Sequence, residues 1–501
     1  MEFIKGMDVS SYQEMKDKGY KYFDVAGNEI DILEYAVQMG FNYGRIRIWN
    51  EPSNRKESGG YCNFRETLKL AKRMKEIGIP YLLDFHYSDW WADPGQQNKP
   101  KKWERLHGKE LEKAVHDYTQ IVVEALTLAE LAPDMVQIGN EIRCGMLWPD
   151  GSVENFHELA NLINAGISGV RDCPNGKDIK IMIHLDQGGR YHYFEDWFDK
   201  IIENGVTDFD IIGLSYYPFW HGTYKDLDET MNKLAHRYNR DLIVAEVAYG
   251  YRMGADSLFG KGQERLGGFS ASQEGQKKAL QIVAGIISGV EDNRGKGFFY
   301  WEPFSRAEEP DNWGYCMGIV DEEGKPLEAL KAVDKEIVIP VEQAREMYNA
   351  IEYADDSQVE LEGENILTDA QFDRLMTGWN YDKPENVTAS IVEDEGIPTF
   401  KFSSVGNVKF DLSHNITIEK SGKYSMVVEY KGDNTTGVCI KPFTKLNGYI
   451  RETNIYPSDT RWTRGTIDLE LDAGTDIVVG IEIDSPQITG EIRNFGVYLK
   501  E

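Results

Sequence analysis

The sequence predicts a (β/α)₈ TIM barrel followed by an all-β sandwich domain. Up to about residue 335, short apolar runs of strand length alternate eight times with longer amphipathic runs of helical period. From about residue 359 the sequence consists of short alternating strands separated by Gly, Asn and Asp, which is typical of a β-sandwich. A chain of 501 residues is also long enough for more than one domain.

The first part reads as eight strand–helix units. The strands are expected at 3–10, 42–49, 80–87, 134–141, 179–186, 209–216, 241–248 and 297–303. The helices between and after them are expected at 31–40, 64–78, 111–130, 156–171, 193–205, 227–239, 272–290 and 327–335. Gly78 and Pro80 illustrate the boundaries, because the glycine ends one helix and the proline begins the next strand. Eight such units favour a closed parallel barrel, and an open doubly wound sheet is the main alternative. No GxGxxG opens the first helix, which argues against a dinucleotide-binding fold.

Three segments follow from this pattern. Residues 1–335 are expected to form the catalytic barrel, and 359–501 the sandwich. Between them, 336–358 has no helix–strand rhythm and ends in an acidic run, so we predict a linker or packing segment there. The runs predicted as sandwich strands are 398–404, 423–432, 463–471, 475–484 and 490–499.

The composition excludes several classes of partner. With 55 Lys and Arg against 84 Asp and Glu, the formal net charge is −29, which repels nucleic acid and anionic membranes but not a neutral glycan. No window approaches 18 apolar residues and no signal-peptide core is visible, so we expect no membrane span. Five cysteines without a CxxC pair exclude a zinc ribbon or a dense disulfide framework. We expect a monomer.

Polar and aromatic residues gather where the predicted strands end. The carboxyl ends of the strands of a parallel barrel meet at one mouth, where the sites of such barrels form. Charged residues are rarely buried singly, so a ring of polar residues at the strand ends indicates either a functional site or a network of structural salt bridges. For Asp8, Arg45, Arg47 and Asp84 both interpretations stand. The strand-end residues are Asp8, Arg45, Arg47, Asp84, His86, Asn140, Glu141, His184, Asp186, Tyr216, Tyr217, Glu246, Trp301 and Glu302.

Glu141 and Glu246 end the fourth and seventh predicted strands, on opposite sides of the mouth, where they could flank a sugar. Glycoside hydrolysis needs one carboxyl group to protonate the leaving oxygen and another to attack the anomeric carbon or direct water at it. A separation of about 5–5.5 Å gives retention and about 6.5–9.5 Å gives inversion. The pair predicts a glycosidase, and the sequence leaves this distance open.

Five long blocks, in barrel order, resemble glycoside hydrolase family 53, the endo-β-1,4-galactanases of clan A. They are LLDFHYSDWWADPGQQNKP (82–100), QIGNEIRCGMLWP (137–149), DFDIIGLSYYPFWHG (208–222), VAEVAYGY (244–251) and FYWEPF (299–304). The resemblance covers about the first 335 residues. It implies hydrolysis of β-1,4-galactan with retention, and an extracellular or cell-surface location.

The resemblance also implies residue roles. Glu141 would be the acid/base, held protonated, and Glu246 the nucleophile. Asn140 would bind the 2-hydroxyl of the sugar being cleaved, and Arg45 would keep Glu246 ionised and its pKa low. The expected substrate-binding residues are Arg45, Asp84, His86, Trp91, Asn140, His184, Tyr217, Trp220, His221 and Trp301.

Two departures from the family matter. Trp90 stands where the family usually has a small residue, so it could add or reshape a subsite. Some relatives carry calcium at the long seventh and eighth loops, but residues 250–272 offer only Asp256 and Glu264 as acidic ligands, without a DxD string. We therefore expect no metal, and the chemistry needs no cofactor.

The C-terminal domain faintly resembles galactose-binding-like sandwich modules, so we predict a carbohydrate-binding module. Candidates for a stacking platform are Trp379, Tyr381, Tyr449, Tyr456 and Trp462. The alternative is that Trp379 and Trp462 are sandwich core.

Two other functions compete with the galactanase. Another clan A glycanase, a mannanase or xylanase, would share the two carboxylates and differ in its subsites. A galactan-binding protein without catalysis would have lost Asn140, Glu141 or Glu246, and this chain retains all three.

Overall fold

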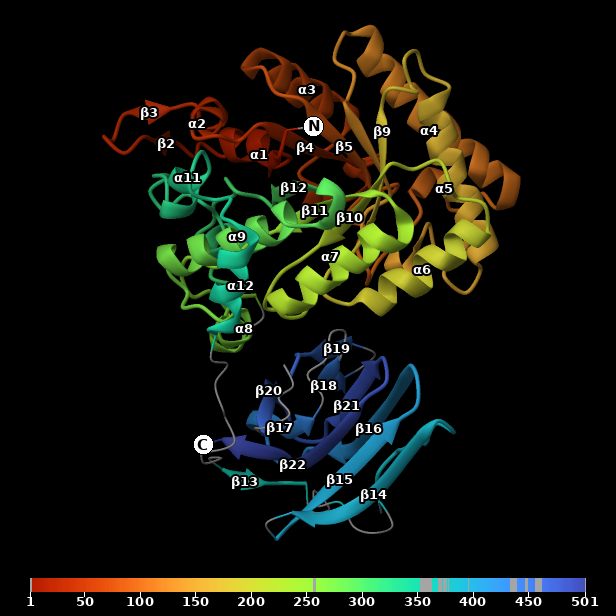
Figure 1. Cartoon of the computed structure of the whole chain (residues 1–501), viewed down its shortest axis with the longest axis vertical. Helices are drawn as coiled ribbons and strands as arrows, with labels where there is room; N and C mark the ends of the chain where they lie inside the picture. The colour runs from red at the N-terminus through yellow and green to blue at the C-terminus, as the bar shows by residue number, and fades with distance from the viewer. Residues whose placement is uncertain are drawn as a thin grey trace. The chain divides into compact units, whose positions relative to one another are not determined.

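A computed structural model of the chain describes residues 2–255, 258–351, 363–367, 372, 376, 378–394, 396–432, 439–446, 449–455 and 462–500. The chain divides into two compact units, Met1–Ile351 and Glu352–Glu501 (Figure 1). Both predicted architectures, the barrel and the sandwich, are confirmed.

The first unit is a closed barrel of eight parallel strands in the order β1-β12-β11-β10-β9-β6-β5-β4. Figure 1 shows α4 to α7 ranged around the outside of these strands. The strands are β1 (Ile4–Asp8), β4 (Tyr43–Ile48), β5 (Tyr81–Phe85), β6 (Met135–Ile138), β9 (Lys180–Leu185), β10 (Ile211–Ser215), β11 (Asp241–Val247) and β12 (Gly295–Tyr300). Several strands end one to three residues earlier than predicted, so His86, Glu141 and Tyr217 lie just beyond them.

The helices of this unit follow the predicted amphipathic runs, with short additions. They are α1 (Tyr12–Asp17), α2 (Ile32–Gln38), α3 (Phe64–Ile77), α4 (Gly108–Leu128), α5 (Phe156–Arg171), α6 (Tyr191–Glu203), α7 (Tyr224–Tyr238), α8 (Lys261–Gly267), α9 (Gln273–Ser288), α10 (Trp313–Cys316), α11 (Glu328–Ala332) and α12 (Val341–Asn349). Gly78 ends α3 with a φ of 77°, a left-handed C-cap that glycine adopts without strain. Two short hairpins complete the unit: β2 (Tyr22–Phe23) with β3 (Glu29–Ile30), and β7 (Gly145–Met146) with β8 (Gly151–Ser152).

The barrel interior has two chemically different layers. The amino-terminal half of the strands fills it with an apolar cluster. The next inward positions carry charge and amide groups. Along β4, for example, the buried residues Tyr43, Arg45 and Arg47 alternate with Ile46 and Ile48, which belong to the core beneath the helices. The cluster consists of Ile4, Tyr43, Leu82, Met135, Met182, Ile211, Ile243, Ala245 and Phe299.

The segment predicted as a linker or packing segment begins as part of the barrel unit. Its helix α12 packs against α9 and α7. Arg345 of α12 donates from Nε to Oδ2 of the buried Asp228 at 2.7 Å. The compact unit therefore extends to Ile351 rather than to 335.

The second unit has two antiparallel sheets around an apolar core. One has the order β14-β15-β22-β17-β20, with β13 beside β22, and the other has the order β16-β21-β18-β19. The strands are β13 (Glu364–Asn365), β14 (Val387–Asp394), β15 (Ile397–Ser404), β16 (Val408–Thr417), β17 (Gly422–Gly432), β18 (Ile440–Leu446), β19 (Tyr449–Glu452), β20 (Thr463–Leu471), β21 (Asp476–Ser485) and β22 (Thr489–Lys500).

Across the described ranges, no helix combines the length and the apolar character needed to cross a bilayer. Cys62, Cys173, Cys316 and Cys439 are buried free thiols.

Candidate active site

Glu141 and Glu246 face each other at the mouth of the barrel. One carboxylate oxygen of each lies within 4.8 Å of the other, and one ring nitrogen of His184 lies within the same distance of both. This spacing is compatible with the short carboxyl separation of retaining glycosidases. Glu141 has a backbone φ of 47°, in the left-handed region that residues with a Cβ rarely adopt. Such strained backbone is concentrated at functional sites.

Arg45 organises the floor of the site. Its side chain is fully buried, and Nη1 donates to Oε1 of Glu246 at 3.1 Å and to Oδ2 of Asp8 at 3.2 Å. Nη2 donates to Oδ2 of Asp84 and to Oδ1 of Asn140, both at 2.9 Å. A buried guanidinium needs several partners to offset its desolvation, and here the partners are the groups that must be positioned.

Glu246 receives two hydrogen bonds, one on each oxygen. Arg45 holds Oε1, and the hydroxyl of Tyr217 donates to Oε2 at 2.9 Å. We expected Arg45 to hold the pKa of Glu246 low. Burial outweighs it and raises the pKa of Glu246 to about 7, while Arg45 and Tyr217 act in the lowering direction.

Glu141 is the less acidic partner. Burial raises its pKa well above the ordinary value, and the nearby charges of Glu246 and Asp186 act in the same direction. Asp186 itself is held by Arg143, which donates from Nε at 2.8 Å and from Nη2 at 3.1 Å. The two catalytic candidates therefore differ as the mechanism requires: Glu246 loses its proton first, and Glu141 retains it.

Asn140, Gln137 and His184 form a second buried layer beside Arg45. Gln137 Nε2 donates to Oδ1 of Asp84 at 2.7 Å, and its Oε1 accepts from Arg45 at 3.2 Å. His184 places Nδ1 3.0 Å from Oδ1 of Asn140 and Nε2 2.9 Å from the hydroxyl of Ser215. Burial and the charge of Arg45 lower the pKa of His184 well below its ordinary value, so the ring is neutral.

Asp84 and His86 lie beneath the mouth. Asp84 is completely buried, and one of its oxygens is 3.1 Å from Nε2 of His86. His86 Nδ1 accepts from the backbone N–H of Ala92 at 3.1 Å. The two predicted binding residues thus fix Arg45 and the loop after β5, so they hold other groups in place.

Aromatic rings form one wall of the mouth. The Arg47 guanidinium lies 4.2 Å from the ring centroid of Trp91 and 5.4 Å from that of Trp301, and these two rings are 5.9 Å apart. Trp90 packs 4.8 Å from the ring of Trp49. The structure therefore gathers Trp90, Trp91 and Trp301 on one side, where the predicted groove requires stacking faces.

A second group of aromatic rings surrounds Tyr217. Its ring lies 5.5 Å from that of Trp220 and 5.4 Å from that of His221. His221 donates from Nδ1 to the carbonyl of Ser215 at 3.0 Å, and burial lowers the pKa of this histidine to about 4. Trp313, which the sequence did not single out, stands 5.6 Å from Tyr217 and donates from Nε1 to the carbonyl of Trp301 at 3.3 Å.

Sequence reasoning also missed Gln137 and Ser215. Both occupy inward positions of apolar strands, two residues after Met135 and Gly213 respectively. A lone polar residue at an inward position of a strand was the available signal.

The C-terminal platform prediction needs correction. Trp379 lies in the core, 4.8 Å from Phe372 and 4.9 Å from Phe495. Tyr381 packs on the same core, against Phe400 and Phe410. Trp462 does not belong to that cluster but is also buried, with Arg493 4.0 Å and Lys431 4.7 Å from its ring. The three therefore do not form one platform, because the apolar rings of the first two fill the space between the sheets. Tyr449 lies in β19, and Tyr456 lies outside the described residues.

Two places bear on metal binding. Both nitrogens of His184 are already engaged, so this residue can ligate an ion only by releasing Asn140 or Ser215. Glu264 accepts from the backbone N–H of Ala271 at 2.6 Å, and Asp256 lies outside the described residues.

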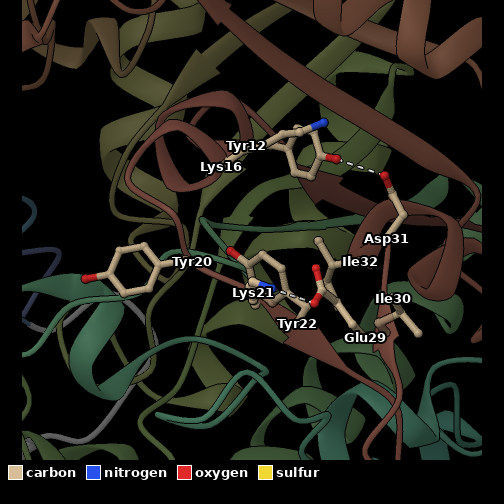
Figure 2. Close-up of a pocket in the computed structure, with 9 residues that line it drawn as sticks. All are labelled: Tyr12, Lys16, Tyr20, Lys21, Tyr22, Glu29, Ile30, Asp31 and Ile32. Carbon is tan, nitrogen blue, oxygen red and sulfur yellow. Dashed lines mark hydrogen bonds and ion pairs between the residues drawn. The ribbon is translucent and has the colours of Figure 1, made fainter.

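A cavity of about 430 Å³ lies away from these residues, between α1 and the β2–β3 hairpin (Figure 2). Its polar groups pair with one another: Tyr12 donates to Asp31 at 2.9 Å, and Lys21 pairs with Glu29 at 2.8 Å. None of the predicted site residues lines it.

Comparison with known proteins places this geometry in a family. The model of glycosyl hydrolase family 53 matches residues 4–333. A protein of Niallia circulans described as "Uncharacterized protein in bgaB 5'region" is 41% identical over 66% of this chain and 93% of its own length. The arabinogalactan endo-beta-1,4-galactanase A of Aspergillus niger is 33% identical over 60% of this chain and 84% of its own. The solved GH53 catalytic domain of Ignisphaera aggregans is 35% identical with a TM-score of 0.63, covering 68% of this chain and 97% of that one. The chain belongs to glycosyl hydrolase family 53.

Proposed function

We propose that this protein is a retaining endo-β-1,4-galactanase in which Glu246 is the nucleophile and Glu141 the acid/base. The observation that carries the proposal is the pair itself. One carboxylate oxygen of the half-buried Glu141 and one of the buried Glu246 lie within 4.8 Å of each other, and only Glu246 has Arg45 and Tyr217 to stabilise its anion. Family membership and the galactanase names of relatives support the substrate.

In the first step, an oxygen of Glu246 attacks the anomeric carbon while Glu141 gives its proton to the leaving glycosidic oxygen. The bond from the anomeric carbon to that oxygen breaks, and a glycosyl ester forms on Glu246. Tyr217 and Arg45 keep the attacking carboxylate ionised and aimed. Asn140, whose amide is fixed by Arg45 and the Ala92 carbonyl, lies beside Glu141, where a 2-hydroxyl contact would form.

In the second step, Glu141 is ionised and acts as the base. It takes a proton from water, which attacks the anomeric carbon and releases Glu246. Loss of the negative charge on Glu246 in the ester lowers the pKa of Glu141, because their mutual repulsion is one of its causes. One residue can therefore serve as acid and then as base.

The substrate assignment is tested by product formation from three glycans. Purified protein is incubated with β-1,4-galactan, β-mannan and β-1,4-xylan, and reducing ends and oligosaccharides are followed. Release from galactan alone supports the proposal. Release from mannan or xylan instead supports another clan A activity, and binding without release supports a silent galactan-binding protein.

Retention is tested separately by ¹H NMR during early hydrolysis. A β-anomer that forms before the α-anomer indicates retention. An α-anomer that forms first would indicate inversion and would contradict the proposed double displacement.

We also propose an extracellular or cell-surface monomer whose chemistry needs no metal. Full activity after dialysis against EDTA is expected if the reaction needs no metal. Light scattering measures the molar mass in solution and so tests the monomer. The proposed glycan-binding role of the second unit now depends on the Trp462 region, and affinity electrophoresis of residues 352–501 in galactan tests it.

A further inference from the structure

We propose that Glu302 is a positioning residue for glycan binding: through Arg47 it holds the rings of Trp91 and Trp301 in place as a stacking wall of the mouth. This inference rests on the proposed function, because it concerns how that site holds its sugar. Glu302 lies two residues beyond β12 and is buried. It takes no part in the two reaction steps above, so its burial at the mouth needs another reason.

The backbone of Glu302 is strained. Its φ is 48°, in the left-handed region that residues with a Cβ rarely adopt, and Glu141 has a φ of 47°. Such a conformation persists only where the surrounding structure holds it. Here the backbone N–H of Trp301 donates to the carbonyl of Val247 at 2.9 Å, and that of Ser305 donates to the carbonyl of Glu302 at 3.3 Å. Strain of this kind is concentrated at functional positions, which favours a functional reason for the direction of this side chain.

The carboxylate of Glu302 has a partner on each oxygen. Oε1 accepts a hydrogen bond from Nη1 of Arg47. Oε2 accepts from the hydroxyls of Ser11 and Ser305, the second at 2.7 Å. The two serines come from the loops that follow β1 and β12, so the carboxylate is held from two sides. The guanidinium that it binds is thereby fixed as well.

Arg47 lies over the rings of the stacking wall. Its guanidinium is 4.2 Å from the ring centroid of Trp91 and 5.4 Å from that of Trp301. The arginine is buried, whereas the two tryptophans are half-buried, so the accessible part of each ring faces away from the cation. A cation over one face of an aromatic ring is attracted to it, and the other face remains for the C–H face of a sugar. Arg47 therefore supports both rings from the covered side.

Asp8 does not replace Glu302 in this role. Its Oδ1 lies 3.7 Å from Nη1 of Arg47, which is too long for a hydrogen bond, and already accepts from the backbone N–H of Ser10 at 2.9 Å. Its Oδ2 accepts from Arg45 at 3.2 Å. Without the charge of Glu302, the guanidinium of Arg47 would move toward Asp8 and away from the two rings.

Glu302 and Arg47 are separate from the hydrogen bonds that tune the reacting carboxylate. Among the described residues, Glu246 is bonded by Arg45 and Tyr217. A change at Glu302 therefore alters the stacking wall and leaves the ionisation of Glu246 as it is. A contact made equally with the bound substrate and the transition state raises KM when it is lost and leaves kcat unchanged. This split separates a positioning role in binding from a role in the reaction.

The test is Glu302→Gln, which keeps the shape and an acceptor oxygen and removes the charge that holds Arg47. KM for β-1,4-galactan should rise about tenfold, as for loss of a desolvated contact between a cation and an aromatic ring. The value of kcat should stay within about twofold, and both limbs of the pH profile should stay in place. In a Glu246→Ala background, which binds without cleaving, calorimetry should show the same rise in the Kd of galactotetraose.

Two further variants separate binding from general damage. Ser305→Ala removes one hydrogen bond from Glu302 and leaves its charge, so it is the milder change if the glutamine variant unfolds, and it should raise KM about two- to threefold. Asp228→Asn is the matched control, because it also removes a buried carboxylate bound by an arginine, here Arg345, but away from the mouth. It should lower the Tm and leave KM and Kd unchanged.

Unchanged KM and Kd in Glu302→Gln, or in Ser305→Ala if the glutamine variant unfolds, overturn the inference. A fall in kcat with a shifted pH limb also overturns it, since Glu302 would then act on the reacting carboxyl groups. A wild-type protein that cleaves no galactan at any pH overturns the proposed function instead. Calorimetry on the Glu246→Ala background needs no turnover, so it still decides whether Glu302 supports binding, and failure of galactotetraose to bind there counts against the inference.

Discussion

The hydroxyl of Tyr217 donates a 2.9 Å hydrogen bond to Oε2 of Glu246, the oxygen opposite the one that Arg45 holds. Both oxygens of the proposed nucleophile are therefore fixed from two strands, β4 and the end of β10. This arrangement orients the carboxylate before substrate arrives.

Tyr217→Phe should move the acidic limb of kcat/KM to higher pH. The bond to Tyr217 lowers the pKa of Glu246, so its removal raises that pKa, and a larger fraction of enzyme is inactive at low pH. We expect a shift of about one pH unit. Profiles recorded on galactan check it, and an unmoved limb would assign Tyr217 to the sugar alone.

Glu246→Ala should abolish turnover of galactan, and azide should restore cleavage with formation of a glycosyl azide. The small anion fills the space of the missing carboxylate and attacks in its place. Product identification by NMR checks the result. Substantial activity of the alanine variant without azide excludes this nucleophile.

Glu141→Ala should lose about 10²–10⁴-fold in kcat on galactan and much less on aryl glycosides with good leaving groups. The reason is that only a poor leaving oxygen needs the proton. Parallel kinetics on the two substrates measure this split, and equal losses on both would contradict the acid/base assignment.

Glu246→Gln should stabilise the protein at pH 8 and not at pH 4. Burial raises the pKa of Glu246 in the folded chain from 4.5 to about 7, so the folded state binds its proton more tightly than the unfolded state. Stability is then lost as the pH rises through this window, by up to about 3 kcal/mol, and glutamine removes that loss. Thermal unfolding at both pH values checks it, and an equal Tm change at the two would refute the linkage.

A fragment of residues 1–351 should unfold cooperatively and cleave soluble galactan, while 1–335 should be less stable. The longer fragment keeps α12 on α9 and α7, and keeps Arg345 paired with the buried Asp228. The Arg345 side chain is half-exposed, so loss of this ion pair alone costs about 1 kcal/mol, and loss of the packing of α12 adds to it. Denaturant titration of the matched pair measures the difference, and equal stability would make α12 dispensable.

Much of this architecture could be predicted from the sequence, because a barrel repeats its pattern and places strand ends at one mouth. Glu141, Glu246 and Arg45 were identified that way, and they meet as expected. The direction in which the pKa of Glu246 shifts could not be predicted, because burial raises it, Arg45 lowers it, and the sequence does not show which effect is larger. The orientation of the Asn140 amide, whose Oδ1 meets His184, could not be predicted either, because no periodicity encodes it.

The side-chain orientations in the sandwich were also hard to predict from the sequence. An aromatic residue in a β-rich sequence packs equally well between two sheets or on a sheet's outer face, and only the register decides. Trp379 and Tyr381 turned inward, so composition alone overestimated the exposed aromatic surface.

The barrel interior is divided into an apolar lower layer, in the amino-terminal half of the strands, and an ionic upper layer around Arg45. This division has an evolutionary consequence. The lower layer can drift among apolar residues of similar volume without harming the fold. A well-packed Leu or Met in place of Arg45 would make the folded state equally stable. Selection for thermal stability alone would therefore replace the ionic upper layer. Arg45 and its ionic partners therefore serve turnover rather than stability, and directed evolution of a more thermostable enzyme should draw its substitutions from below the level of Arg45.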